Sequence, residues 1–370
     1  MEPIRVLQIV TTMERAGLET MLMNYYRNID REKVQFDFLR HRDGEHAYDA
    51  EIKELGGRIY TIPPFNPVNS NGYIDALDEF FEEHQEYQIV HSHLDCLSAV
   101  PLQYAKKYGV ITRIAHSHVS KMNFDKKYPI RMFLRRKIPK VATDLFACSD
   151  DAGKWMFRNN PYSVITNAID CNLFAYDTSV AQKLRAKYEL EDKFVVGHVG
   201  RFDAVKNHAF LIDVFREIVK RKENSVLILA GTGSTMDRIK SLVEQYGLTD
   251  KVRFLGSISN VAETMQLMDA FVFPSLYEGL GISLIEAQAS GLPCYTSLGS
   301  VPMTVNITGN VEYLSLKKEA KEWADSILKG YEKNLIRDTI SSRVVTAGYD
   351  IKQEAKKLEK MYLEYSRRGN

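Results

Sequence analysis

The sequence predicts an α/β protein of two domains, each built on a parallel sheet wrapped by helices. Three observations support this fold class. The chain of 370 residues is long enough for about two domains, each with a sizeable core. Short apolar runs alternate with helical patterns, which is typical of parallel strands joined through helices. These runs fall into two series, separated by a polar stretch that begins at residues 167–174.

The first series is a set of apolar runs of strand length. They lie near residues 4–11, 34–40, 58–62, 88–93, 111–116, 144–148 and 163–166. The second series follows the same pattern and comprises runs at residues 194–197, 225–230, 252–255, 270–273 and 293–296. The last predicted helix, residues 353–366, has apolar side chains at helical spacing, which indicates packing in a core. These side chains are Leu358, Met361, Tyr362 and Tyr365.

The composition excludes several classes of protein. A formal net charge of +1, with 26% charged and 45% hydrophobic residues, is ordinary for a globular protein and does not favour nucleic-acid binding. The four cysteines form no Cys-x-x-Cys pair, so we expect buried thiols in a reducing compartment rather than disulfides or a zinc site. The N-terminus leads directly into a strand, so we expect no signal peptide, no spanning helix and a cytoplasmic location.

The strongest candidate site lies in residues 274–294. The strand before it ends at Pro274, a loop with Gly279 and Gly281 follows, and an apolar stripe then opens a helix. The two glycines let the backbone approach a ligand while the first helical N–H groups point outward, and this geometry suits phosphate. The loop is therefore a candidate anion site.

Two glutamates flank this loop with seven residues between them. Glu278 lies in the loop and Glu286 lies a turn inside the helix. Carboxylates beside a phosphate site are well placed to accept hydrogen bonds from sugar hydroxyls. Taken alone, the stretch fits better with a plainer interpretation, a buried strand followed by an amphipathic helix that carries two surface glutamates.

A second candidate site follows the first strand of the second series. Arg201 and Lys206 lie five residues apart across a predicted strand-to-helix turn. An arginine can bind an anion in a bidentate manner and a lysine can add a point charge, so the two side chains can converge on one anion. Alone, such a pair is often a surface salt-bridge group.

Three motifs together resemble one family, the family 4 retaining glycosyltransferases, which have the GT-B fold of two facing Rossmann-like domains. The Glu278-to-Glu286 spacing resembles the family's Glu-x7-Glu motif, and Gly200-Arg201 with Lys206-Asn207 resembles its Gly-Arg…Lys-Asn pair. Residues 167–174 resemble its interdomain linker, although Ala168 replaces a glycine. The resemblance implies domains at 1–175 and 176–351, with a C-terminal helix, 352–370, that crosses back to the first domain.

The resemblance also implies roles for individual residues. Arg201 and Lys206 would bind the nucleotide diphosphate, Glu286 the ribose hydroxyls, and Glu278 would lie near the donor sugar. The remaining expected nucleotide-sugar contacts come from loops. They are Gly231 and Gly233, the base-binding loop with Asn260 and Val261, and the backbone of Gly279, Leu280, Gly281 and Ile282.

Two His-Ser-His sequences end neighbouring predicted strands, at 91–93 and 116–118. The carboxyl ends of parallel strands are where open α/β sheets place a ligand crevice. No carboxylate or thiolate completes an obvious metal-ligand set, so we expect no metal here. The resemblance assigns His118 to the donor sugar, near its 6-hydroxyl, and leaves His91, His93 and His116 as rim or packing residues.

The loop after the first strand contains Gly17 and Glu19, in a position where the family has paired glycines and a glutamate facing the donor phosphates and the acceptor. Gly17 is equally compatible with a plain helix start. The loop is not Gly-x-Gly-x-x-Gly, which argues against a dinucleotide oxidoreductase.

Residues 121–140 form the one strongly polarised stretch. Eight basic residues interleave with aromatic and aliphatic ones against a single acid, Asp125. Such a stretch is compatible with a helix on an anionic membrane surface and equally with a solvated helix face.

The sequence therefore predicts a retaining glycosyltransferase that uses a nucleotide-diphospho-sugar, with UDP-hexose or UDP-N-acetylhexosamine as donor. The acceptor is expected to be a glycan or a lipid-linked saccharide of surface polysaccharide synthesis, because residues 278–294 resemble capsule and exopolysaccharide enzymes. No Asp-x-Asp occurs in the chain, so we expect no obligatory metal and no other cofactor. The alternatives are a UDP-sugar 2-epimerase of the same fold and a non-catalytic module that binds glycan or membrane.

Overall fold

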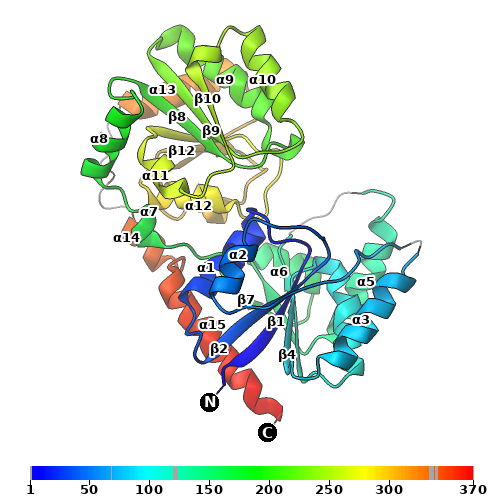
Figure 1. Cartoon of the computed structure of the whole chain (residues 1–370). Helices are drawn as coiled ribbons and strands as arrows, with labels where there is room; N and C mark the ends of the chain where they lie inside the picture. Colours follow the sequence, from blue (N-terminus) through cyan, green and yellow to red (C-terminus); the bar gives the residue numbers. More distant parts are fainter. Residues whose placement is uncertain (1, 68, 120–123, 333–336, 338–340, 370) are drawn as a thin grey trace. The chain divides into compact units, whose positions relative to one another are not determined.

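A computed structural model of the chain describes residues 2–67, 69–119, 124–332, 337 and 341–369. It divides into two compact units, Met1–Ala168 with Ile351–Asn370 and Ile169–Asp350. Figure 1 shows that each unit has its strands side by side, with helices around them. Both are α/β units with an all-parallel sheet, as the alternation of strand and helix patterns predicts.

The first unit contains a sheet in the order β3-β2-β1-β4-β5-β6-β7. The strands are β1 (Ile4–Val10), β2 (Val34–Arg40), β3 (Ile59–Thr61), β4 (Ile89–Ser92), β5 (Thr112–Ser117), β6 (Asp144–Ala147) and β7 (Ser163–Val164). Each coincides with a predicted strand to within one or two residues at each end. The order reverses between β1 and β4, so this is the doubly wound arrangement that places ligands at the carboxyl edge.

Two layers of helices cover this sheet and divide its core. One core cluster joins the sheet to α1 (Gly17–Asn28), α2 (Asp49–Glu54) and the C-terminal α15 (Ile351–Ser366). The other joins it to α3 (Asn71–Glu83), α4 (Ala99–Lys107), α5 (Tyr128–Val141) and α6 (Asp150–Phe157). Two 3₁₀ turns, η1 (Asp95–Ser98) and η5 (Arg367–Gly369), complete the unit.

The helix α15 packs against α1 and β2, which confirms that the end of the chain returns to the first unit. Its buried face includes Leu358, Tyr362 and Tyr365 of the predicted apolar stripe, whereas Met361, the fourth side chain of that stripe, is partly buried. Tyr362 meets Phe36 of β2 edge to face, with ring centroids 5.8 Å apart.

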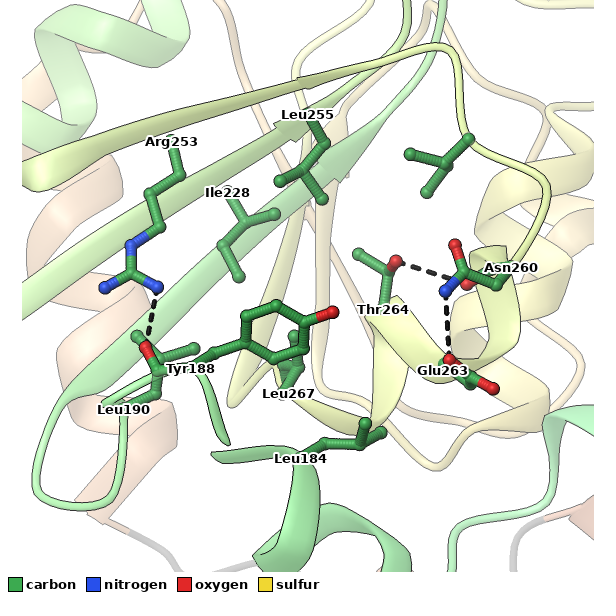
Figure 2. A pocket seen from close by; sticks show the side chains of 11 residues that line it. Leu184, Tyr188, Leu190, Ile228, Arg253, Leu255, Asn260, Glu263, Thr264 and Leu267 are labelled. Carbon is green, nitrogen blue, oxygen red and sulfur yellow. Dashed lines mark hydrogen bonds between the residues drawn. The ribbon is translucent and has the colours of Figure 1, made fainter. Parts of the chain in front are cut away.

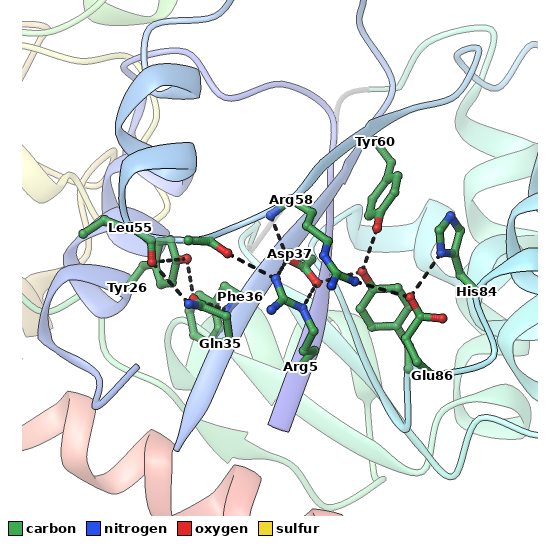
Figure 3. Close-up of polar contacts among 12 residues, drawn as sticks. Arg5, Tyr26, Gln35, Phe36, Asp37, Leu55, Arg58, Tyr60, His84 and Glu86 are labelled. Atoms are coloured by element: carbon green, nitrogen blue, oxygen red, sulfur yellow. Dashed lines mark hydrogen bonds and ion pairs between the residues drawn. The ribbon is translucent and has the colours of Figure 1, made fainter. Parts of the chain in front are cut away.

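A buried acid in the middle of β2 shows how this unit satisfies polar groups away from its carboxyl edge. Asp37 has no solvent exposure, and it accepts hydrogen bonds from the Arg5 guanidinium, the Tyr87 hydroxyl (2.7 Å) and the Arg58 backbone N–H (2.7 Å). Figure 3 shows Arg5 and Arg58 beside the Asp37 carboxylate. Because several donors surround it, the charge is compensated and the cluster serves the fold.

The second unit has a sheet in the order β10-β9-β8-β11-β12-β13. The strands are β8 (Phe194–Val199), β9 (Ser225–Ala230), β10 (Val252–Gly256), β11 (Ala270–Phe273), β12 (Cys294–Ser297) and β13 (Val311–Leu314). All but β13 coincide with predicted strands. The edge strand β13 is an addition to the prediction, because four residues with one apolar side chain at each end give too short a pattern to predict a strand.

Helices cover both faces of this sheet as well. One face carries α9 (His208–Arg221), α10 (Met236–Gln245) and α13 (Ala320–Glu332). The other carries α7 (Cys171–Phe174), α8 (Thr178–Lys187), α11 (Val261–Gln266), α12 (Ile282–Ala289) and α14 (Ser341–Thr346). The short 3₁₀ turns are η2 (Ala204–Lys206), η3 (Thr249–Lys251) and η4 (Met303–Val305).

The boundary between the units lies at Ala168 and Ile169, whereas the sequence predicts it at 175 and 176. Residues 169–175 belong to the second unit for a physical reason. The Ile169 N–H donates to Tyr349 O at 2.9 Å, and Phe174 of α7 is buried in that unit's core. The return point lies at Asp350 and Ile351, one residue before the predicted one.

The four cysteines are all free and buried, which agrees with the expectation of thiols without disulfides. None of the helices in the described ranges has the length and apolar character that crossing a membrane requires.

Candidate active site

The second unit brings a lysine and a glutamate together at the carboxyl edge of its sheet. Lys206 ends the turn η2 after β8, and Glu278 lies in the loop after β11. Lys206 Nζ lies 2.5 Å from Glu278 Oε1 and 4.7 Å from the centroid of the Phe273 ring. Both charged side chains are largely buried, so the pair places a fixed cation beside a fixed anion in a partly desolvated position.

Backbone hydrogen bonds hold these two loops against each other. The Leu276 backbone N–H donates to Val205 O at 2.7 Å, and the side-chain amide of Asn207 donates to the backbone oxygen of Pro274 at 3.2 Å. Asn207 itself has a left-handed backbone, φ +55°, which turns the chain from η2 into α9. The position of Lys206 beside Glu278 is therefore fixed by the backbone as well as by charge.

Arg201 takes a different position from Lys206. Its guanidinium lies 3.2 Å from Asp203 Oδ2, and its side chain is 69% exposed. Asp203 Oδ1 also accepts a hydrogen bond from the Lys206 backbone N–H, so one carboxylate holds the arginine and the turn that carries the lysine. The structure thus leaves Arg201 free to turn toward an anion, whereas Lys206 is already engaged.

The start of α12 has the form that the sequence predicts for an anion site. Gly281 is its N-cap, with φ +76°, and a Cβ there would lie 3.1 Å from the Phe273 ring. A glycine is therefore needed both for the backbone conformation and for the close packing on Phe273. The first N–H groups of α12 have no partner within the helix, and the helix dipole favours an anion at this end.

Glu286 lies one turn inside α12 and is 7% exposed. Burial raises its pKa to about 7, so the carboxyl group is close to half protonated at neutral pH. A group of this kind can both accept hydrogen bonds from hydroxyls and donate one.

The Gly-x-Gly after β9 has a packing role. Gly231 has φ +138°, and a Cβ on it would lie only 2.0 Å from Gly200 O. Gly233 is similarly close to Phe202 O. The two glycines therefore let the loop after β9 lie directly on the backbone that carries Arg201.

Asn260 and Val261 lie at the start of α11, beside an apolar cavity of about 170 Å³ (Figure 2). Asn260 donates to Glu263 Oε2 at 2.9 Å, and Arg253 closes another side by donating to Tyr188 O at 2.7 Å. Of the residues expected to contact the nucleotide sugar, Asn260 is the one that lines this cavity. The cavity contains none of the charged groups near Lys206, so its chemistry differs from that of the anion site.

In the first unit, the two His-Ser-His sequences meet at the carboxyl edge of the sheet. His91 and His116 lie on β4 and β5, His93 and His118 directly follow these strands, and the rings of neighbouring pairs lie 4.1–5.3 Å apart. His91 Nε2 lies 3.2 Å from His116 Nδ1, and His93 Nδ1 lies 3.0 Å from His118 Nε2. Burial is the main cause that lowers the pKa of all four imidazoles, so they are neutral at pH 7.

Two buried partners of this cluster escape the sequence analysis. Gln8 Oε1 lies 2.9 Å from His93 Nε2, and the hydroxyl of Tyr362 lies 2.7 Å from His91 Nδ1. The sequence does contain a signal for Gln8, because it is a polar residue in the middle of an apolar strand. Tyr362 is 271 residues away from His91, and no local pattern connects the two.

Three of these histidines, His91, His93 and His116, have ligand atoms within 4.8 Å of one another, which is compatible with a metal ion. However, both ring nitrogens of His91 and both of His93 already lie within hydrogen-bond distance of a partner. A metal ion would have to break these bonds. We therefore treat the group as a hydrogen-bonded cluster.

Gly17 is the first residue of α1, which follows the loop after β1. Glu19 is buried in the first turn of this helix. The helix-start interpretation of Gly17 therefore accounts for its position in the structure, and a contact with the donor remains a proposal.

The basic stretch forms α5 in its second half, and Lys121, Met122 and Asn123 lie outside the described residues. Leu134, Ile138 and Val141 bury one face of the helix. The opposite face carries Phe133, which is 56% exposed, with Arg136, Lys137 and Lys140 at neighbouring helical positions. Lys137 Nζ lies 4.6 Å from the centroid of the Phe133 ring, so the exposed face combines an aromatic side chain with positive charge.

Comparison with known proteins identifies the class. The structure matches that of Anabaena HepE, solved in complex with UDP and glucose, with a TM-score of 0.80 and 18% identity over 97% of this chain and 99% of the other. It also matches WaaG, a glycosyltransferase of lipopolysaccharide biosynthesis, with a TM-score of 0.72 and 13% identity over 96% of this chain and 99% of the other. These matches, together with the two parallel sheets, define a protein of the GT-B fold.

The sequence matches place the chain within that class. Residues 180–362 match the model of the glycosyl transferases group 1 family. The chain is 36% identical to EpsF of Bacillus subtilis (strain 168), which is named as a glycosyltransferase, over 97% of this chain and 96% of the other. It is 24% identical to the capsular polysaccharide biosynthesis glycosyltransferase CapH of Staphylococcus aureus, over 97% of this chain and 99% of the other. The chain therefore belongs to the glycosyl transferases group 1 family, the family 4 glycosyltransferases, and is an enzyme of that class.

Proposed function

We propose that this enzyme is a retaining transferase that moves a hexose or N-acetylhexosamine from a UDP-sugar to a glycan or lipid-linked acceptor in surface polysaccharide synthesis. The observation that carries the proposal is Lys206, held beside Glu278 at the edge from which α12 also starts. The names of relatives support the substrate classes. CapH is a capsule enzyme, and a 26% identical Escherichia coli relative uses UDP-Gal and an acceptor on diphosphoundecaprenol.

The difficult step in such a transfer is the departure of a diphosphate from an oxocarbenium-like carbon. Fixed positive groups and backbone N–H donors stabilise the leaving charge because they need no reorganisation during the reaction. Lys206 and Arg201 supply the charge, and the backbone at 279–282 supplies donors. When the diphosphate binds, it competes with Glu278 for the Lys206 ammonium, and the released Glu278 carboxylate is then available to hydroxyls of the donor sugar.

Further contacts complete the proposed donor site. Glu286 accepts hydrogen bonds from the ribose, the loop with Asn260 and Val261 holds the base, and His118 binds a hydroxyl of the transferred sugar. No Asp-x-Asp occurs in the chain, and the leaving group is stabilised by protein cations in this proposal. We therefore propose that turnover needs no divalent ion and no other cofactor, and that the departing phosphate oxygen takes the acceptor's proton on the same face of the sugar.

The direct experiment incubates the purified protein with UDP-hexoses and UDP-N-acetylhexosamines, with and without EDTA, and follows UDP release and the sugar product. Transfer or slow hydrolysis that survives EDTA is the expected result. A product that is a free or UDP-linked 2-epimer identifies the epimerase alternative instead. Absence of UDP release with every donor and acceptor tested supports the non-catalytic binding module.

We further propose that the exposed face of α5 attaches the enzyme to the inner face of the cytoplasmic membrane. Phe133 can enter the lipid interface while Arg136, Lys137 and Lys140 contact anionic headgroups. Sedimentation with liposomes of anionic or neutral lipid tests this. Binding to anionic liposomes, lost when Phe133, Arg136 and Lys140 are replaced by serine, is expected. Equal sedimentation with both lipids excludes it.

A further inference from the structure

The buried histidine cluster has a hydrogen-bond direction that follows from the orientation of the Gln8 amide. Because burial keeps the four imidazoles neutral, each ring carries one N–H group and one nitrogen lone pair. A ring that donates through one nitrogen must therefore accept through the other. Once the direction of one hydrogen bond is known, the directions of those that follow it are known as well.

Gln8 sets this direction for the first chain of hydrogen bonds. Its Oε1 atom can only accept, so His93 Nε2, 2.9 Å away, must carry the proton. His93 Nδ1 is then the lone pair, and His118 Nε2, at 3.0 Å, must donate to it. His118 Nδ1 is left as an acceptor. It is buried and has no hydrogen-bond partner among the residues that the structure describes.

The amide nitrogen of Gln8 sets the direction of a second chain of hydrogen bonds. Gln8 Nε2 donates to the Tyr362 oxygen at 3.3 Å, so the single hydroxyl proton of Tyr362 is directed to His91 Nδ1 at 2.7 Å. His91 Nε2 must then donate to His116 Nδ1 at 3.2 Å, and His116 Nε2 carries a proton. This atom, too, is buried and has no partner within the described ranges of the chain. One chain therefore ends on an unused acceptor and the other on an unused donor.

The histidine cluster differs from the cluster around Asp37 in its unused atoms. Both carboxylate oxygens of Asp37 accept hydrogen bonds, from Arg5, Arg58 and Tyr87. The two unused atoms belong to His116 and His118, whose rings are 4.1 Å apart. A buried polar atom without a partner has a free-energy cost, and a ligand group that supplies the missing hydrogen bond removes this cost.

We infer that Gln8 is a positioning residue that, through His93, holds His118 in the tautomer with its proton on Nε2 and its Nδ1 atom as a hydrogen-bond acceptor. The inference rests on the proposed function, in which His118 contacts a hydroxyl of the donor sugar. Because His118 Nδ1 is an acceptor, the sugar must offer it a hydrogen-bond donor, such as the 6-hydroxyl of a hexose. A 6-deoxy sugar lacks that group and therefore loses the bond.

Imidazole ¹H–¹⁵N correlation spectra of the full-length protein, labelled with ¹⁵N-histidine, test the tautomers without any substrate. The expected result at pH 7.5 is a proton on Nε2 of His93 and His118. A proton on Nδ1 of His118 would overturn the inference, because it requires the Gln8 amide to be turned the other way. Spectra that change when EDTA is added would also overturn it, since they would show a bound metal ion in place of the hydrogen bonds.

Two variants at position 8 separate positioning from a merely structural role. Gln8→Leu removes the acceptor, so His93 and His118 should show mixed tautomers, while Gln8→Glu keeps an acceptor and should keep the wild-type tautomer of His118. Identical spectra for Gln8→Leu and wild type would contradict the inference. The wild-type spectrum alone decides the tautomer if neither variant folds.

Kinetics with paired donors then test the consequence for specificity. The kcat/KM for the 6-hydroxy donor should fall about tenfold in Gln8→Leu, the usual effect of one lost hydrogen bond, while kcat/KM for the 6-deoxy donor stays the same. An equal fall for both donors would indicate a structural role only. If no donor is turned over at all, the proposed function fails, whereas the tautomers are still decided by the spectra.

Discussion

The carboxyl edge of the first unit's sheet carries four neutral imidazoles, which are hydrogen-bonded in two pairs. The same edge of the second unit's sheet carries Lys206, Glu278 and the start of α12. The two sheets have the same parallel, doubly wound construction. Their edges nevertheless differ in charge. In our proposal the neutral edge therefore meets an uncharged hydroxyl and the charged edge a diphosphate. The comparison shows that the site residues, rather than the shared architecture, decide what each unit can bind.

The largest effect should come from removing the cation of the second edge. Lys206→Ala, and separately Arg201→Ala, should lower kcat by a hundredfold or more, because the leaving diphosphate loses a fixed positive charge. The measurement is steady-state transfer with a UDP-sugar. Lys220→Ala, which changes an exposed lysine of α9, is the matched control and should turn over normally. Near-normal turnover in Lys206→Ala would remove this residue from the mechanism.

The next effect concerns nucleotide affinity. Glu286→Gln should weaken UDP binding about tenfold, with a smaller effect on kcat, because a buried acceptor for the ribose hydroxyls is replaced by a weaker one. Isothermal titration with UDP measures the affinity directly. An unchanged dissociation constant would reject the ribose role and leave Glu286 as a residue of the helix core.

The neutral edge should make the first unit sensitive to acid. Burial lowers the pKa of the four histidines, so below about pH 6.5 the unfolded chain takes up protons that the folded unit cannot, and stability falls as the pH drops. Asp95, whose pKa burial raises to about 6, partly offsets this.

The two tryptophans allow this to be measured in each unit, since Trp155 lies in the first and Trp323 in the second. Trp323→Phe leaves Trp155 to report on the first unit, and Trp155→Phe leaves Trp323 to report on the second. Thermal unfolding of both variants, followed by fluorescence, should show a steeper fall in melting temperature between pH 6.5 and 5 for the first unit. The second unit has two buried histidines with lowered pKa, His198 and His208, and should lose less. A steeper loss in the second unit would contradict the account.

The smallest effect is the reverse pH dependence expected from Glu286. Its pKa is raised to about 7 in the folded protein, so its contribution to stability is present below pH 4.5 and is lost as the pH rises through 7. Glu286→Gln should therefore melt a few degrees higher than wild type at pH 8, with the gap closing toward pH 5. A gap that does not change with pH would show that the carboxyl group is not buried as an acid.

All strands of the two sheets except β13 are predictable from the sequence, because buried parallel strands are short, nearly continuous apolar runs between helices. The Glu278 and Glu286 spacing, and the placement of the histidines at strand ends, follow from the same local patterns. Local patterns do not show which distant residue forms a hydrogen bond or an ion pair with each of these side chains. The sequence predicts that Lys206 and Arg201 can converge on an anion. It contains no sign that Lys206 lies beside Glu278, 72 residues away, or that Arg201 pairs with Asp203.

The histidine cluster illustrates the same limit. The sequence indicates that His91, His93, His116 and His118 share an edge, but not that a glutamine of β1 and a tyrosine of the last helix set their hydrogen-bond directions. The tyrosine contact is created by the return of α15 to the first unit, whereas the glutamine contact joins β1 to the residue that follows β4. The partners are 271 residues apart for Tyr362 and His91 and 85 residues apart for Gln8 and His93, so no local periodicity predicts either contact.

The most direct test of the central claim, that the charged edge of the second unit is a metal-independent nucleotide-diphosphate site, is a thermal-shift titration of the purified protein with UDP, GDP, ADP and NAD, repeated in EDTA. A ligand that binds only the folded state raises the melting temperature according to its affinity. The account predicts a rise with UDP that survives EDTA and is lost in Lys206→Ala. No rise with any of these nucleotides, or a rise with NAD alone, would contradict it.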